Sequence, residues 1–300
     1  MKLFKETLSI NFLNHTMVTG ILSCICVVSA VLIILIKGLN LTIEFTGGTN
    51  LNISVSKIAV SEFRLKAQQA LKDNLQIVEI QSDSKKSNFL LRMKFIEDEK
   101  NIINSLKVLF PDLELNSIDS FGPKLGAELQ SNARNAILMA LLLISIYIAI
   151  RFDRYYALGS IFALLHDVLI TIGLLSILNI EIGISIIAAL LTIVGYSLND
   201  TIVVYDRIRE NIAKLISDQK RAIINRSLNE TLNRTVITSF TTLLVVIVLF
   251  VYGGAVLQSF ALTLIIGVLI GTYSSIYVAS PIMFYFEEKY PIPEFIDEEA

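Results

Sequence analysis

The chain has 300 residues, of which 54% are hydrophobic and only 17% carry a charge. Soluble domains contain about 25% charged residues, so this composition indicates a membrane protein. The formal net charge of −2 leaves no basic excess that would indicate nucleic acid as a partner.

The chain begins with MKLFKETLSINFLNH, in which Phe4, Leu8 and Phe12 are spaced four apart and Lys2 and Lys5 lie beside Phe4. This spacing predicts a cytoplasmic amphipathic helix, residues 1–16, that lies on the membrane surface. A frayed polar terminus is the alternative. The apolar run that follows is too long for the core of a cleaved signal peptide and no A-x-A site follows it, so an uncleaved membrane anchor is expected.

Six apolar runs are long enough to cross a bilayer, because a spanning helix needs about 20 residues at a rise of 1.5 Å each. They cover residues 17–36, 133–150, 158–178, 184–205, 236–252 and 260–282. The fifth run is short, and we expect Arg234 and Thr235 to extend it. The sixth is expected to end near Pro281.

Residues 37–132 separate the first two spans and predict a small domain of their own. Strands are predicted at 51–56, 76–81, 88–95 and 113–120, and helices at 60–73 and 97–110. The order β-α-β-β-α-β is that of a ferredoxin-like α+β fold. The segment carries no catalytic triad, metal-ligand cluster or phosphate-binding lysine motif, so a binding or mechanical module is expected.

Basic residues gather in two of the segments between spans. Residues 151–157 carry Arg151 and Arg154, and residues 206–235 carry Arg207, Arg209, Lys214, Lys220, Arg221, Arg226 and Arg234, whereas 179–183 and 253–258 carry none. Since Lys and Arg favour the cytoplasmic side, the basic loops and both termini are predicted to be cytoplasmic and residues 37–132 periplasmic. The expected order is therefore the N-terminus 1–16, helix 17–36, the domain 37–132, helices within 133–282 with a cytoplasmic loop at 206–235, and an acidic cytoplasmic tail, 283–300.

Ionisable residues inside membrane spans are costly and usually functional. The third span contains His166 and Asp167, and Asp167 shares one helical arc with Ser160, Ala163 and Thr171. The fourth span places Thr192, Tyr196, Asn199 and Asp200 within about 100° of arc. Arg234 begins a run of hydroxyl residues in the fifth span: Thr235, Thr238, Ser239, Thr241 and Thr242.

These residues suggest a proton relay or a gating pair, in which Asp200 opposed by Arg234 loads and releases protons. Tyr196, Asn199, His166 and Asp167 are the further candidates. Interfacial or purely structural roles for Asp200 and Arg234, and a core role for His166, are the alternatives. In the sixth span, Gly267, Gly271 and Ser275 recur every four residues, a spacing typical of close helix packing within or between subunits.

No nucleotide-binding fold, nucleophile arrangement or metal-ligand cluster is recognisable, so no enzymatic activity and no cofactor are predicted. Cys24 and Cys26 are two apart in one apolar run, where a helix turns them to different faces. They are interpreted as apolar filler.

A set of motifs resembles a known family. In chain order these are IEFTGGT (43–49), GPKLGAEL (122–129), RFDR (151–154), HD (166–167), GYSLNDTIVVYDRIREN (195–211), NRSLNETLNRTVITSFTTL (225–243), YGG (252–254) and GTYSSIYVASP (271–281). Together they are similar to the SecF family, the smaller membrane subunits of bacterial SecD–SecF export complexes, in the RND superfamily. Glu44 stands where many relatives have Asp.

The resemblance implies a six-span half that pairs with SecD and assists the SecY translocon and the ATPase SecA. The pair would use the proton-motive force to draw a translocating preprotein across the inner membrane late in export, with protons and membrane lipid as its other contacts. The family's essential acid falls on Asp200 and its arginine on Arg234. Two other functions stay open: half of an RND exporter of small molecules or lipids, and a scaffold without proton chemistry. Exporters usually have larger external domains.

Overall fold

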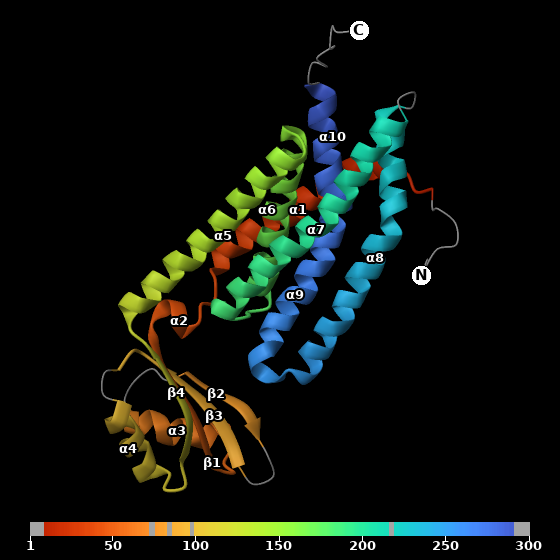
Figure 1. Ribbon diagram of the computed structural model, residues 1–300. Helices are drawn as coiled ribbons and strands as arrows, with labels where there is room; N and C mark the ends of the chain where they lie inside the picture. Colours follow the sequence, from red (N-terminus) through yellow and green to blue (C-terminus); the bar gives the residue numbers. More distant parts are fainter. Residues whose placement is uncertain (1–8, 72–75, 83–85, 97–98, 216–218, 291–300) are drawn as a thin grey trace. The chain divides into compact units, whose positions relative to one another are not determined.

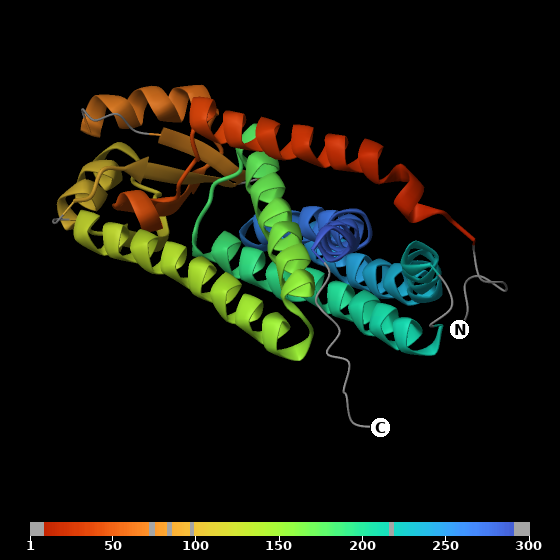
Figure 2. The same ribbon diagram turned by 90° about the horizontal axis from the view of Figure 1, so that it is seen from above.

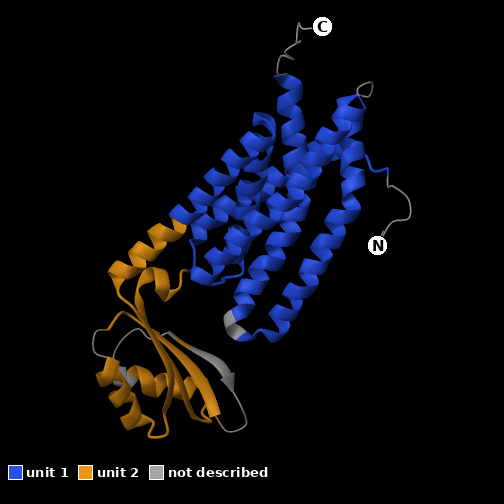
Figure 3. Cartoon of the chain, viewed as in Figure 1, with its two compact units in different colours: residues 1–40, 135–300 blue, residues 41–134 orange. Residues whose placement is uncertain are grey.

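The computed structural model describes residues 9–71, 76–82, 86–96, 99–215 and 219–290. The chain divides into two compact units, one made of Met1–Asn40 with Asn135–Ala300 and the other of Leu41–Arg134 (Figure 3). Each unit is described by itself.

Within the described residues, six helical segments are long and apolar enough to cross a membrane, as predicted (Figure 1). Their helices are α1 (Thr16–Lys37), α5 (Pro123–Arg151), α6 (Arg154–Ile177), α7 (Ile184–Lys214), α8 (Lys220–Tyr252), and α9 (Gly254–Ser274) with α10 (Ser280–Lys289). The helix α6 contacts α1, α7, α9 and α10, which makes it the centre of the bundle (Figures 1 and 2). Side chains on α6 therefore reach several helices at once.

The predicted cytoplasmic loop at 206–235 is largely helical, because α7 runs on to Lys214 and α8 begins at Lys220. Glu210 pairs with Lys214 at 2.5 Å and Arg226 with Glu230 at 3.0 Å, both one turn apart. Such pairs stabilise exposed helix surfaces. The apolar runs of the fourth and fifth spans therefore stop at charged residues, while the helices α7 and α8 extend beyond them.

Pro281 does not end the sixth span, contrary to expectation. Proline lacks the N–H that would close the regular helical bond. The chain widens into a π-helical turn at Ser275–Ala279 and then continues as α10. The Ser280 hydroxyl donates to the Ser275 carbonyl oxygen at 3.1 Å.

The predicted N-terminal amphipathic helix lies mostly outside the described residues, which begin at residue 9. Phe12 lies in a 3₁₀ turn, Phe12–His15, and only 4% of it is exposed. It packs with Leu13 in the core of the helical unit, against residues such as Tyr205 and Ile208. The structure therefore places Phe12 inside the bundle rather than on a membrane-facing surface.

The second unit has the predicted ferredoxin-like order. Its strands are β1 (Gly48–Ser56), β2 (Gln76–Ser82), β3 (Lys86–Met93) and β4 (Glu114–Phe121), and its helices are α3 (Val60–Leu71) and α4 (Glu99–Leu109). The antiparallel sheet has the order β2-β3-β1-β4. Alternate residues of β1 and β3 face the helices, and Phe63 of α3 stacks on Phe89 of β3 with ring centroids 4.2 Å apart.

Two adjacent glycines join a short helix, α2 (Ile43–Thr46), to β1. Gly47 and Gly48 have φ angles of 76° and 153°, which side chains rarely allow. A Cβ atom on Gly48 would lie 2.9 Å from the carbonyl oxygen of Met93, and one on Gly47 would lie 3.0 Å from the Cα of Pro123. The close approach of three backbone segments thus requires glycine at both positions.

We expect Gly48→Ala to loosen the 41–134 unit, because the new methyl group meets backbone at a strained φ angle. A cost of roughly 1–3 kcal/mol would speed amide hydrogen exchange in β1 and β4. The measurement is hydrogen exchange on the full chain in detergent. Gly195→Ala, where a Cβ meets nothing within 4 Å, is the matched control. Equal protection in the two variants would contradict the steric argument.

Candidate functional site: two buried carboxylates in the helical unit

The carboxylate of Asp167 is buried and fully engaged. It is 1% exposed and contacts side chains from three helices. Its Oδ1 lies 2.9 Å from His166 Nδ1 on α6, and its Oδ2 accepts from Ser197 of α7 at 2.6 Å and from Ser274 of α9 at 2.7 Å. Donors of this kind compensate the loss of water around a buried carboxylate. The arrangement ties α6, α7 and α9 together, and we call these four residues the Asp167 cluster.

The predicted small-residue stripe of the sixth span lies against α7. A Cβ atom on Gly267 would lie 2.1 Å from Ile193 Cδ1, and one on Gly271 would lie 2.9 Å from Ser197 Cβ. The Ser275 hydroxyl lies 3.0 Å from that of Thr201. The contact is within this chain, and it brings Ser274 within reach of Asp167.

Asp200 is buried but incompletely paired. It is 2% exposed, and its Oδ2 has no hydrogen-bond partner among the described residues. Arg234 and Ser239 lie on α8, the other helix of the hairpin that carries Asp200. An open carboxylate oxygen inside an apolar bundle is a place where a proton can bind, because burial disfavours the charged form.

Asp200 and Arg234 lie at the same depth in the hairpin that α7 and α8 form. Asp200 is 14 residues before the end of α7 and Arg234 is 14 residues after the start of α8, so each is about 21 Å along its helix from the turn. They form no ion pair within 4.0 Å in the described part of the chain. Arg234 is exposed in the chain by itself.

The other predicted site residues divide between the two carboxylates. His166 joins Asp167, while its Nε2 has no hydrogen-bond partner among the described residues. Tyr196 is half-buried and donates to Ser239 at 3.3 Å, next to Asp200. Asn199 is exposed, so the structure does not bring it into the Asp200 site.

Sequence reasoning missed the hydroxyl partners Ser197, Ser274 and Thr272. Ser239 lies 2.7 Å from Thr272, which extends the Tyr196 contact onto α9. The sequence did contain a signal for them. A carboxylate in a membrane span needs hydrogen-bond donors from the protein, and Ser and Thr residues in the spans can supply these donors. No group of three His, Cys, Asp or Glu side chains within the described ranges could hold a metal ion.

Comparison with known proteins agrees with the family resemblance of the sequence motifs. The family model described as protein export membrane protein SecD/SecF, C-terminal, matches residues 101–289, and that of the SecD/SecF GG motif matches residues 32–57. The chain belongs to the SecD/SecF family. The resemblance seen in the sequence is thereby confirmed, and the glycine pair before β1 falls within the second match.

Two SecD/SecF relatives match most of the chain. The protein translocase subunit SecF of Calditerrivibrio nitroreducens is 39% identical, over 95% of this chain and 96% of the relative. The subunit of the same name from Escherichia coli O157:H7 is 41% identical, over 86% of this chain and 82% of the relative. With the six apolar helices, this family makes the chain a multi-pass protein of the bacterial inner membrane.

Solved SecDF structures share the fold. A crystal structure of SecDF, a translocon-associated membrane protein from Thermus thermophilus, is 38% identical with a TM-score of 0.83, and the match covers 96% of this chain and 40% of that one. SecDF in a super-membrane-facing form is 36% identical with a TM-score of 0.70. The chain thus spans about two fifths of these SecDF chains.

We expect Asp167→Ala to destabilise the helical unit, because the change removes an acceptor that three helices share. Leaving buried donors without their partner costs roughly 1–3 kcal/mol. The measurement is the thermal unfolding midpoint of the purified chain in detergent. Asp206→Ala removes a carboxylate that is 45% exposed and pairs with Arg151 at 3.3 Å, and it should change little. Equal midpoints for the two variants would show that the cluster does not hold the helices.

Proposed function

We propose that this chain is the SecF-type half of a proton-driven auxiliary unit of the Sec protein translocase. Its partner would be SecD, and the pair would act beside the SecY translocon and SecA on a preprotein late in translocation. The support is the family, the translocase names of its relatives, and SecDF chains that hold this fold in two fifths of their length. The remaining length of those chains leaves room for a second membrane half.

The proposed proton role depends on the burial and hydrogen bonding of the Asp200 carboxylate. Its carboxylate is buried within the bundle, one oxygen has no hydrogen-bond partner among the residues that the structure describes, and a cation lies at the same distance from the hairpin turn on the neighbouring helix. A proton that binds there can cross part of the membrane potential, which supplies about 2.3 kcal/mol per elementary charge per 100 mV. Asp167, by contrast, has its donors in place and holds the scaffold.

Arg234 would be the gating partner of Asp200. Its guanidinium is always charged and lies exposed on α8 in the isolated chain. Movement of α8 relative to α7 would change its distance from Asp200 and so change the affinity of that carboxylate for a proton. Coupling between helix position and protonation is what a proton-driven motor needs.

The proposed orientation follows the distribution of basic residues. Both termini and the charged hairpin of α7 and α8 would face the cytoplasm, which places residues 37–132, including the ferredoxin-like unit, in the periplasm. There the unit could contact preprotein as it emerges. The chain itself would perform no enzymatic reaction and need no cofactor, and ATP hydrolysis would come from SecA.

We expect Asp200→Asn to abolish the part of export that depends on the proton-motive force, because an amide cannot release a proton. The measurement is preprotein export by a strain whose only copy is the variant, with the level of assembled SecD complex recorded alongside. Asp206→Asn, an acid on the same helix with 45% exposure, is the control. Unchanged export at a normal complex level would favour the scaffold function, and export of a small hydrophobic compound instead of preprotein would favour the exporter.

We expect Arg234→Met to lose export while the chain still copurifies with SecD. Methionine retains the apolar length of the side chain and removes the charge that acts on Asp200. The measurement is affinity copurification and export in the same cells. Arg226→Met, on the same helix and paired with Glu230, serves as the control. Loss of copurification would instead assign Arg234 a structural role at the subunit contact.

A further inference from the structure

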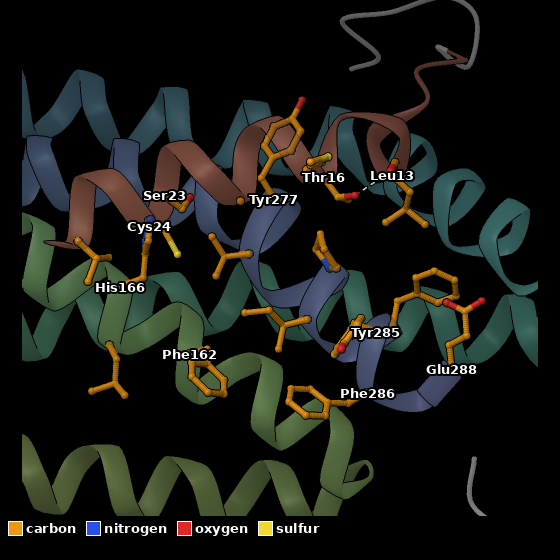
Figure 4. Close-up of a pocket in the computed structure, with 18 of the residues that line it drawn as sticks. Leu13, Thr16, Ser23, Cys24, Phe162, His166, Tyr277, Tyr285, Phe286 and Glu288 are labelled. Atoms are coloured by element: carbon orange, nitrogen blue, oxygen red, sulfur yellow. Dashed lines mark hydrogen bonds between the residues drawn. The ribbon is translucent and has the colours of Figure 1, made fainter. Parts of the chain in front are cut away.

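A deep apolar groove opens between α1, α6 and α10, and His166 of the Asp167 cluster is among the residues that line it (Figure 4). Its volume is about 1180 Å³. The walls include Met17 and Gly20 of α1, Phe162 and Leu165 of α6, and Ile282 and Phe286 of the last helix. Pockets for small ligands measure about 300–1,000 Å³, so this groove has room for a whole amphiphile rather than for a single side chain.

The depth of the groove matches one leaflet of a bilayer. Leu169 lines its deep end, 15 residues after the start of α6, or about 22 Å along that helix. Half of a bilayer about 40–45 Å thick, with its headgroup regions included, is of similar length.

The mouth of the groove carries one cation and one anion, Arg221 and Glu288. Arg221 donates to the Leu13 carbonyl at 3.0 Å and to Asn14 Oδ1 at 3.2 Å, just before α1 begins at Thr16. It therefore lies beside the start of α1. Glu288 lies near the end of α10, and neither residue forms an ion pair in the described ranges.

Two lysines next to these residues in the sequence are engaged elsewhere in the described part of the chain. Lys220 pairs with Glu287 at 3.0 Å. Lys289 lies over the rings of Tyr285 and Tyr290, 5.4 and 5.6 Å from their centroids. Of the described residues, the Arg and Glu side chains that line the groove are thus one guanidinium and one carboxylate, Arg221 and Glu288.

We propose that this groove binds one zwitterionic phospholipid of the phosphatidylethanolamine type. Its acyl chains fill the apolar channel, its phosphate accepts from Arg221, and its ammonium group donates to Glu288. Arginine suits phosphate because its planar fork offers paired donors, and a carboxylate accepts from a primary ammonium group. An anionic lipid would satisfy Arg221 but would place its charge beside Glu288. The binding does not depend on the proposed proton coupling.

The test is native mass spectrometry of the delipidated full chain with added phosphatidylethanolamine, phosphatidylcholine or phosphatidylglycerol. We expect about one phosphatidylethanolamine per chain to be retained, and the other two lipids to be retained at least several-fold less. Arg221→Ala should reduce this retention, and Glu288→Lys should shift it toward phosphatidylglycerol. Lys214→Ala removes a charge outside the groove and should leave retention unchanged.

A steric variant keeps the test independent of charge. A Cβ atom at Gly20 meets nothing within 4 Å, so Gly20→Leu fills the groove without displacing backbone. Gly195→Leu adds the same side chain to an exposed position of α7 with equally open surroundings. Retention should fall at least about fivefold in Gly20→Leu alone.

Three results would overturn the proposal. The first is equal phosphatidylethanolamine retention in Gly20→Leu and Gly195→Leu. The second is tighter binding of phosphatidylglycerol by the unaltered chain, which would identify an anionic lipid as the occupant. The third is a photocrosslinker at Leu165 that joins the chain to another protein in cells, which would identify a partner segment.

Discussion

A buried carboxylate in a membrane bundle must find its hydrogen bonds within the protein, since lipid offers none. At Asp167 this requirement is met by Ser197, Ser274 and His166, and the first two lie on other helices. Donor distances of 2.6 and 2.7 Å allow little sliding between helices. The register of α6, α7 and α9 therefore depends on this one acid. Gly267 and Gly271 complement it, because only glycine lets α9 come close enough for Ser274 to donate.

The same need for hydrogen bonds within the protein distinguishes Asp200 from Asp167. It lies three residues after Ser197 on α7, so the Asp167 cluster sets the depth and direction of its carboxylate. One acid is saturated with donors and the other keeps an oxygen free. In the proposed function, the first acid would hold the helices in register and the second would be the one that exchanges a proton.

The sequence predicted the features that depend on local periodicity. Apolar run length located the spans, and the alternation of strands and helices predicted the ferredoxin-like unit. Helical spacing placed Asp167 on a polar stripe, and Ser160, Ala163 and Thr171 are indeed buried with it. The same spacing did not separate buried Asp200 from exposed Asn199, because an arc of a helix does not reveal where the neighbouring helix ends. The sequence did not predict that Ser274 donates to Asp167 or that a π turn precedes Pro281. Both features depend on packing between helices that are distant in sequence.

Exposure at membrane depth indicates which surface of the bundle needs a partner. Exposed residues of α5, such as Leu138, Leu142 and Ile146, are apolar and suit lipid. On the α7–α8 hairpin, however, Asn199 in the fourth span and Arg234 at the start of the fifth are both exposed. Polar groups in membrane spans face protein or a water-filled cavity rather than lipid. The proposed SecD half would therefore cover this surface, and the cation that acts on Asp200 would lie at the subunit contact. A movement between the two halves would then reach the proton site directly, through a side chain that belongs to the contact.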